Sequence, residues 1–235
     1  MGLCALLSPF VYKQFETPRE YATALGEQRT IQLADSSIVT LNADSRIELR
    51  MDGRHRDIKL RRGEALFKVA HDPNRPFTVQ TDTVIVRAVG TQFNVYERPN
   101  GTRVSVLEGR VLITPFGGGG TMNAARAAES LGAGQEAQVA PDGTIRRNAK
   151  ADVINTVAWR ERRLIFEDAP LEDVIYEFNR YNQSPRLTLD GVPPGSHHYN
   201  GIFDAADPDS LAELLSREPD LSIERRNGEI VIRRR

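Results

Sequence analysis

The stretch from residue 77 to residue 113 constrains the fold more than any other part of the sequence. Gly90, Pro99-Asn100-Gly101 and Glu108-Gly109 divide it into runs, and such residues are typical of tight turns. Within the runs, β-branched and aromatic residues alternate with polar ones: Val84, Val86, Ala88, Phe93, Val95, Val104, Val106, Val111 and Ile113. Alternation with period two is typical of strands that bury one face. The stretch therefore predicts short stacked strands that carry no catalytic side chain.

The residues before this stretch predict further strands. From Arg29 onward, short extended runs alternate with turn signals about every ten residues, which is typical of an all-β domain. We place one of these turns at Gly63-Glu64, between runs that contain Leu60 and Leu66. Residues 16–28 are expected to form one or two helical turns ahead of the first strand. The predicted fold class is mainly β, with strands stacked as a solenoid or a sandwich.

The last 80 or so residues have a different pattern. Pro170 suits the first position of a helix, and apolar residues then follow at helical spacing: Leu171, Val174, Ile175 and Phe178. Asp207 is expected to cap a second helix, and Asn227-Gly228 to form a hairpin turn. The predicted order is β-α-β-β-α-β-β, a small two-layer α/β module. The polar, aperiodic residues 146–152 separate it from the all-β part.

Composition excludes several classes of function. The 235 residues have a formal net charge of −1, which gives no general attraction to nucleic acid, so no nucleic-acid partner is predicted. Cys4 is the single cysteine, so no disulfide within the chain and no cysteine-based zinc site is expected.

No group of residues predicts enzymatic chemistry. His197-His198 would point to opposite faces of a strand, which argues against a shared metal ion. Asp168 and Glu172 are explained by their position at a helix start. Gly117–Gly120 lacks the lysine of a phosphate-binding loop and is read as a hairpin tip or insertion. We therefore predict no enzyme, no catalytic residue, no cofactor and no metal.

Arg180 and Tyr181 are the candidate partner-binding residues. Both types are favoured at protein interfaces. A structural role is the alternative, because arginine suits a helix C-terminus.

The motifs resemble those of the FecR family, whose members are bacterial inner-membrane regulators of extracytoplasmic-function (ECF) sigma factors. The all-β part is similar in order and spacing over almost 90 residues, although Ser36 stands where the family phrase has glycine. The C-terminal part resembles the STN module of secretins and TonB-dependent receptors. The matching segments are Gly26–Arg29, Leu33–Asn42, Arg56–Leu60, Gly63–Val69, Arg75–Phe77, Ala88–Val95, Leu131–Gln135, Trp159, Leu164–Phe166, Pro170-Leu171 and Phe178–Tyr181.

This resemblance implies two domains, a FecR-like all-β domain over 21–150 and an STN-like module over 153–235. It also implies a function: sensing, in the periplasm, the N-terminal signalling domain of a TonB-dependent receptor, typically for an iron siderophore. A non-signalling scaffold or interaction module of the cell envelope is the alternative function. A strand of the partner adding to an exposed sheet edge is one binding mode open to such a module.

Residues 1–20 are expected to be either a disordered N-terminus or the remnant of a membrane span. Gly2 to Tyr12 is apolar apart from Ser8, but about 20 apolar residues are needed to cross a bilayer. The family's cytoplasmic anti-sigma domain has no counterpart in the sequence. The sigma factor is therefore expected as a partner only through such a domain, and the membrane only through a missing or partial N-terminal span that anchors the full-length protein.

Overall fold

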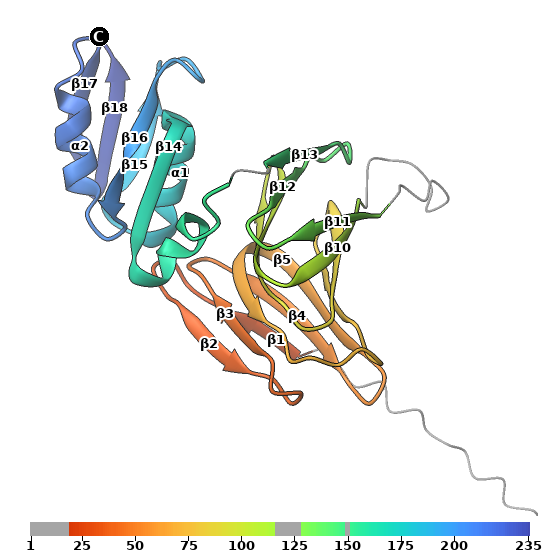
Figure 1. Cartoon of the computed structure of the whole chain (residues 1–235). Helices are drawn as coiled ribbons and strands as arrows, with labels where there is room; N and C mark the ends of the chain where they lie inside the picture. Colours follow the sequence, from red (N-terminus) through yellow and green to blue (C-terminus); the bar gives the residue numbers. More distant parts are fainter. Residues whose placement is uncertain (1–18, 116–127, 149–150) are drawn as a thin grey trace, which may run out of the picture.

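The computed structural model describes residues 19–115, 128–148 and 151–235, and they form two parts that lie side by side (Figure 1). In the first part the strands join into one strongly curled sheet that resembles a half-barrel. These strands are β1 (Arg19–Ala22), β2 (Arg29–Gln32), β3 (Ile38–Leu41), β4 (Arg46–Met51), β5 (Arg56–Lys68), β6 (Phe77–Gln80), β7 (Val84–Ala88), β8 (Gln92–Arg98), β9 (Gly101–Glu108), β10 (Arg110–Pro115), β11 (Glu129–Gly132), β12 (Glu136–Val139) and β13 (Ile145–Asn148).

Strand β5 joins the two halves of the curled sheet. Its first half pairs with β4 and β6, and its second half pairs with β3 and β8. Gly63 lies where the partners change and has a φ of 80°. A Cβ there would lie 2.3 Å from the Ser45 Oγ, so no side chain fits. The turn predicted at Gly63-Glu64 is therefore wrong: glycine here permits a bend within one long strand.

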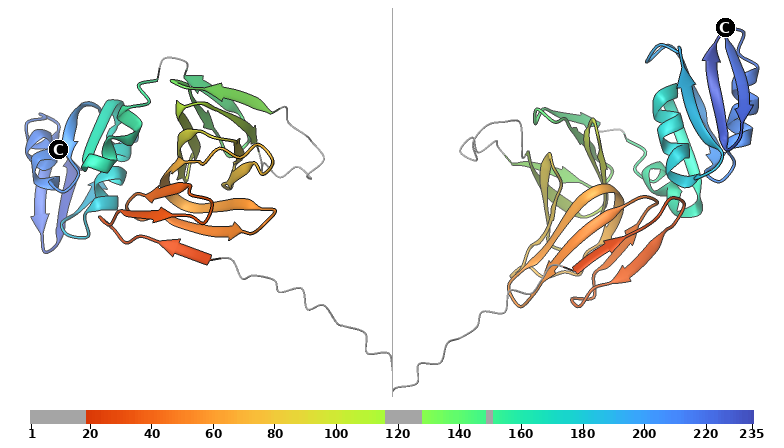
Figure 2. Two further views of the ribbon diagram at one scale, coloured as in Figure 1. Left: turned by 60° about the horizontal axis from the view of Figure 1, so that its bottom comes forward. Right: turned by 180° about the vertical axis from the view of Figure 1, so that it is seen from behind.

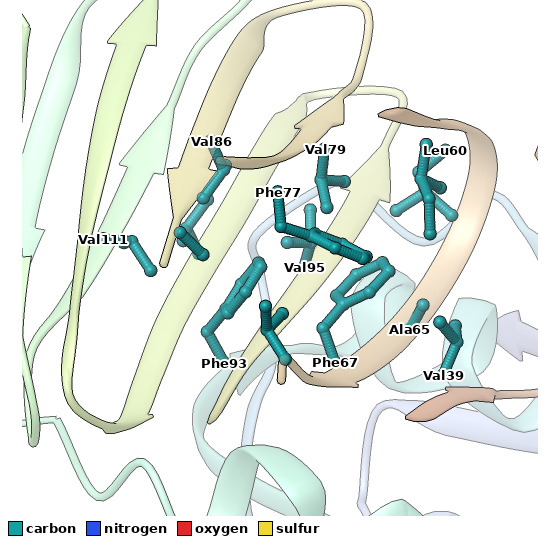
Figure 3. Packing of buried hydrophobic residues seen from close by; sticks show 14 of the residues in the cluster. Val39, Leu60, Ala65, Phe67, Phe77, Val79, Val86, Phe93, Val95 and Val111 are labelled. Carbon is teal, nitrogen blue, oxygen red and sulfur yellow. The ribbon is translucent and has the colours of Figure 1, made fainter. Parts of the chain in front are cut away.

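The interior of the curled sheet is an apolar cluster (Figure 3). Phe67, Phe77 and Phe93 are fully buried at its centre. The rings of Phe67 and Phe93 stack with centroids 5.2 Å apart, and Phe77 lies 6.0 Å from Phe67. The alternating residues of the 77–113 stretch all point into this cluster, so the prediction of a mainly β fold is confirmed.

The start of the described chain differs from expectation. Residues 19–22 form strand β1, which pairs with β4, so helical turns over this segment are wrong. Tyr21 of this strand packs on the core across from Ile47. Ser36 occupies the turn between β2 and β3 with a φ of 70°, a conformation that favours glycine.

The second part follows the predicted order. It contains a 3₁₀ helix η1 (Asn155–Glu161), β14 (Arg163–Pro170), α1 (Leu171–Tyr181), β15 (Arg186–Asp190), β16 (His198–Asp204), α2 (Pro208–Ser216), β17 (Leu221–Arg226) and β18 (Glu229–Arg234). Strands β14 and β16 form one sheet, and β15, β18 and β17 form another, with the helices packed against them (Figure 2). The predicted cap is confirmed, because the Asp207 carboxylate accepts from the Ser210 amide. Pro170 lies just before α1 rather than within it.

Two predictions concern residues outside the described ones, the apolar N-terminus and the loop at Gly117–Gly120. The proposed domain boundaries stay a prediction. Among the described residues, none of the helices is long and apolar enough to cross a membrane.

Candidate functional site: the junction and cleft between the two parts

The last turn of α1 fits against the curled sheet. The apolar stripe of α1 is buried within the α/β module, which leaves the following residues to face the sheet. Arg180 is 3% exposed and Tyr181 is 8% exposed. The two candidate partner-binding residues therefore lie at the junction between the two parts of the chain.

Arg180 makes contacts in both parts. Its Nη2 donates to the Ala43 carbonyl at 2.8 Å, and its Nη1 donates to Glu177 at 3.1 Å. The Glu64 Oε2 lies 3.5 Å from Nη1, and the guanidinium lies 4.6 Å from the centre of the Tyr96 ring. Burial opposes the charge, but Tyr96, Glu177 and Glu64 together raise the pKa of Arg180 well above its ordinary value. Arg180 is therefore a permanent cation enclosed by two carboxylates and a ring.

Glu64 is the buried carboxyl group of the junction. It accepts from the Asn42 Nδ2 at 2.7 Å and from the Asn94 Nδ2 at 2.8 Å. Burial raises its pKa, and the positive charge of Arg180 offsets only part of this effect. Because Arg180 is the cation closest to it in the described part, the charge of Glu64 depends on the docked α1.

Tyr181 and the backbone complete the contact. The Tyr181 hydroxyl donates to the Asn42 Oδ1 at 2.8 Å. The Gly26 amide donates to the Arg180 carbonyl at 2.9 Å. Gly26 has a φ of 71°, and a Cβ there would lie 2.7 Å from the Tyr181 carbonyl oxygen. The approach of the two parts at this point therefore requires glycine.

A second set of charges borders the junction on its outer side. The Arg98 Nη2 lies 2.8 Å from the Asp173 Oδ1, and the Tyr96 hydroxyl donates to Glu177. Arg98 also lies over the Tyr176 ring, 5.3 Å from its centre. These contacts hold the first turns of α1 against β8.

A cleft of about 420 Å³ opens beside this junction. One wall contains residues of β9 and β12, and the other contains the whole of β14. Seven carboxylates and three guanidinium groups line it, so the cleft is acidic. Trp159 also lines it, and its buried Nε1 has no hydrogen-bond partner in the described part of the chain.

The role of Arg180 and Tyr181 toward an outside partner stays a prediction. In this structure both side chains bind within the chain, so a partner would reach them only after the two parts separate. Sequence reasoning missed their partners Asn42 and Glu64, and Asn94, which donates to Glu64. The available signal was a charged residue, Glu64, directly before the apolar run 65–67, but it was interpreted as part of a turn.

The other polar candidates lie apart from the junction. His197 is within 3.1 Å of an Asp220 carboxylate oxygen and not in a cluster with His198. Asp168 and Glu172 flank the start of α1, as expected. The described residues contain no group of three or more side chains suited to hold a metal ion.

Comparison with known proteins shows a matching family domain and a matching fold. Residues 19–112 match the family described as FecR protein. Two crystal structures of "a putative anti-sigma factor" from Parabacteroides distasonis have the same fold, with TM-scores of 0.78 and 0.77 at 24% sequence identity. The similarity covers 92% and 93% of this chain and 99% of each of those chains. No curated protein sequence matches the chain.

Proposed function

We propose that this chain is the signal-receiving region of a FecR-family regulator of an ECF sigma factor. The observation that carries the proposal is the FecR domain at residues 19–112, joined to an α/β module through a largely buried junction. The anti-sigma description of the Parabacteroides distasonis structures, which share both parts of the fold, supports the same function. The region acts by binding and relaying rather than by catalysis.

The proposed partner is the N-terminal signalling domain of a TonB-dependent outer-membrane receptor for an iron siderophore. The resemblance of the C-terminal module to STN modules supports this partner, as does the acidic cleft between the two parts. Such a partner places residues 19–235 in the periplasm, in a protein anchored to the inner membrane. We assign no contact with the sigma factor to these residues.

Deletion of residues 153–235 from the chromosomal gene tests the proposal. Receptor-dependent induction of the sigma factor's target promoter should be lost in the deletion strain. Immunoblotting must show that the shortened protein accumulates. Normal induction without these residues would contradict the proposal and favour the envelope scaffold.

A binding measurement gives the same test without deletion. Calorimetric titration of the purified chain with the receptor's signalling domain should give a saturable complex. A receptor domain from an unrelated transport system is the matched control. Equal heats for both domains would contradict specific sensing.

A further inference from the structure

We propose that the outer edge of β14 binds an extended, basic protein segment as an additional strand. The inference rests on the proposed function, since it assigns that partner's docking place to one strand and one wall of the cleft. It also specifies the chemistry of the docking segment.

The backbone of β14 has one unpaired side. In the described part of the chain β14 pairs with β16 alone. The Arg162 carbonyl accepts from the Ala205 amide at 2.8 Å, so it points toward β16. Backbone groups alternate along an antiparallel strand, so those of Arg163, Ile165 and Glu167 point away from β16. No described backbone group outside β14 and β16 bonds to these three residues.

The unpaired side faces the cleft rather than open solvent. All residues of β14 line the cleft, and the opposite wall contains Arg103, Glu136 and Gln138 of β9 and β12. Figure 1 shows β14 as the strand of its module nearest to the first part. A segment that enters the cleft therefore meets a row of free amides and carbonyls, as in strand-addition complexes.

The pairing edge is short and has a defined end. The register between β14 and β16 shifts between Phe166 and Ala169. Asp168 at this bulge has a φ of 50°, and its amide donates to the Asn200 Oδ1 at 2.8 Å. The added strand can therefore pair with Arg163 to Glu167 and must diverge beyond them.

Apolar side chains flank this edge. Ile165 lies opposite Ile202, and their side chains share the face of the sheet that points away from the module's core. Ile202 is 60% exposed, and Ile154, which lines the same hollow as Ile165, is 74% exposed. An added strand with apolar residues at alternate positions would cover this face.

The charge of the cleft selects a basic segment. Four lining carboxylates form no ion pair among the described residues: Glu136, Asp152, Glu167 and Asp168. Of the three lining guanidinium groups, Arg98 is bound to Asp173 and Arg163 lies near Glu161. Lysine or arginine in an added strand would be attracted to these carboxylates, which have no ion-pair partner in the described part of the chain.

The test titrates the isotopically labelled full chain with a short peptide of alternating lysine and valine. We expect hydrogen-exchange protection at the amides of Arg163, Ile165 and Glu167. A peptide with glutamate in place of lysine should bind at least about tenfold more weakly. Equal binding of the two peptides, or protection confined to another strand edge, would overturn the proposal.

Ile165→Pro removes the central outward amide and leaves the bonds to β16. This variant should lose protection and binding. Arg225→Pro, on the edge strand β17, is the matched control. The Asp220 carbonyl accepts from the Arg235 amide and so points toward β18. By alternation, the backbone amide of Arg225 points to the unpaired side of β17. The control should bind normally. Normal binding by Ile165→Pro would overturn the proposal.

Glu167→Lys keeps every backbone group and serves if the proline variant does not fold. It should weaken binding of the lysine peptide about tenfold at low salt and less at high salt. Glu229→Lys, an exposed change on β18, is its control. Unchanged binding of the lysine peptide by Glu167→Lys would contradict the proposal that the docking segment is basic.

Two further outcomes separate this inference from the proposed function. Peptide binding at β14 together with no complex of the receptor domain would leave the inference standing and contradict the function. A concentration-dependent dimer that Ile165→Pro abolishes would show that a second copy occupies the edge, which would overturn the proposal.

Discussion

The described part of the chain contains two buried arginines, and their surroundings differ in one respect. Arg56 is 1% exposed within the curled sheet region, where it donates to the carbonyls of Ala70 and Arg75 and to Asp35. All of its contacts belong to the same part of the chain. Arg180 is as deeply buried, but its contacts come from both parts. The same residue type thus stabilises one fold at the first site and joins two folds at the second.

The carboxylates beside the two arginines also differ. Burial opposes the charge of Asp35, but donors from Ser37 and Arg56 outweigh it and lower the pKa of Asp35. At Glu64 burial prevails and raises the pKa. The surroundings of Asp35 therefore favour its charged form. The surroundings of Glu64 disfavour the charged form, and Arg180 offsets part of this effect.

The largest expected effect comes from replacing either arginine. Arg180→Met leaves Glu64 buried without its nearby cation, which should cost about 3–5 kcal/mol of unfolding free energy. Arg56→Met should cost a similar amount, because Asp35 and several carbonyls lose their donor. Denaturant unfolding followed by circular dichroism measures both. A loss below about 1 kcal/mol in either variant would contradict the assigned roles.

The single tryptophan distinguishes the two variants. Trp159 is 4% exposed at the junction, and its carbonyl accepts from the Gln28 Nε2 at 2.6 Å. In Arg180→Met its fluorescence should shift to the red at lower denaturant than the loss of strand signal. In Arg56→Met both signals should change together. Coincident transitions in Arg180→Met would show that the junction does not open separately.

Gly26→Ala tests the close approach without changing a charge. The added Cβ meets the Tyr181 carbonyl at 2.7 Å with a φ of 71°, so about 2 kcal/mol should be lost. Gly134→Ala is the control, because it has a φ of 78° and no atom within 4 Å. Equal losses in the two variants would indicate backbone strain alone.

The pH dependence of stability should have opposite signs at the two sites. The lowered pKa of Asp35 gives stability that is present above its unfolded value of 3.8 and is lost as pH falls below it. The raised pKa of Glu64 means that stability falls as pH rises above its unfolded value of 4.5.

Each slope should disappear in its own variant. Asp35→Asn should remove the loss of unfolding free energy at acid pH, and Glu64→Gln should remove the decrease above pH 4.5. Unfolding free energies measured between about pH 3 and pH 7 test both. If the contributions of Asp35 and Glu64 to the pH dependence of the unfolding free energy had the same sign, the proposed difference between the two sites would be wrong.

The smallest expected effect is at an exposed turn of the sheet region. Ser36→Gly should add about 0.5–1 kcal/mol, because Ser36 has a φ of 70° that glycine adopts with less strain. Ser216→Gly, at the end of α2, should instead lose about 0.5 kcal/mol. Thermal unfolding of both variants measures the difference. A lower unfolding temperature for Ser36→Gly would contradict backbone strain at Ser36.

The sequence predicts local features well and the junction poorly. The alternation of Val84 and Val86, and the cap at Asp207, depend on neighbours along the chain, so both were predictable. Gly63 was misassigned because glycine marks both turns and bends within strands. Arg180 and the carbonyl of Ala43 are 137 positions apart, and no local pattern connects them. The family motifs contain several junction residues, but a motif does not show which residues meet.

The central claim is that the Glu64–Arg180 contact couples the two parts of the chain. A double-mutant cycle of Glu64→Gln and Arg180→Met measures this coupling directly. Its readouts are the unfolding free energy and the Trp159 fluorescence. We predict a coupling energy of about 2 kcal/mol, with the double variant losing less than the sum of the single changes. Additive losses, with Trp159 still buried in the double variant, would contradict the claim.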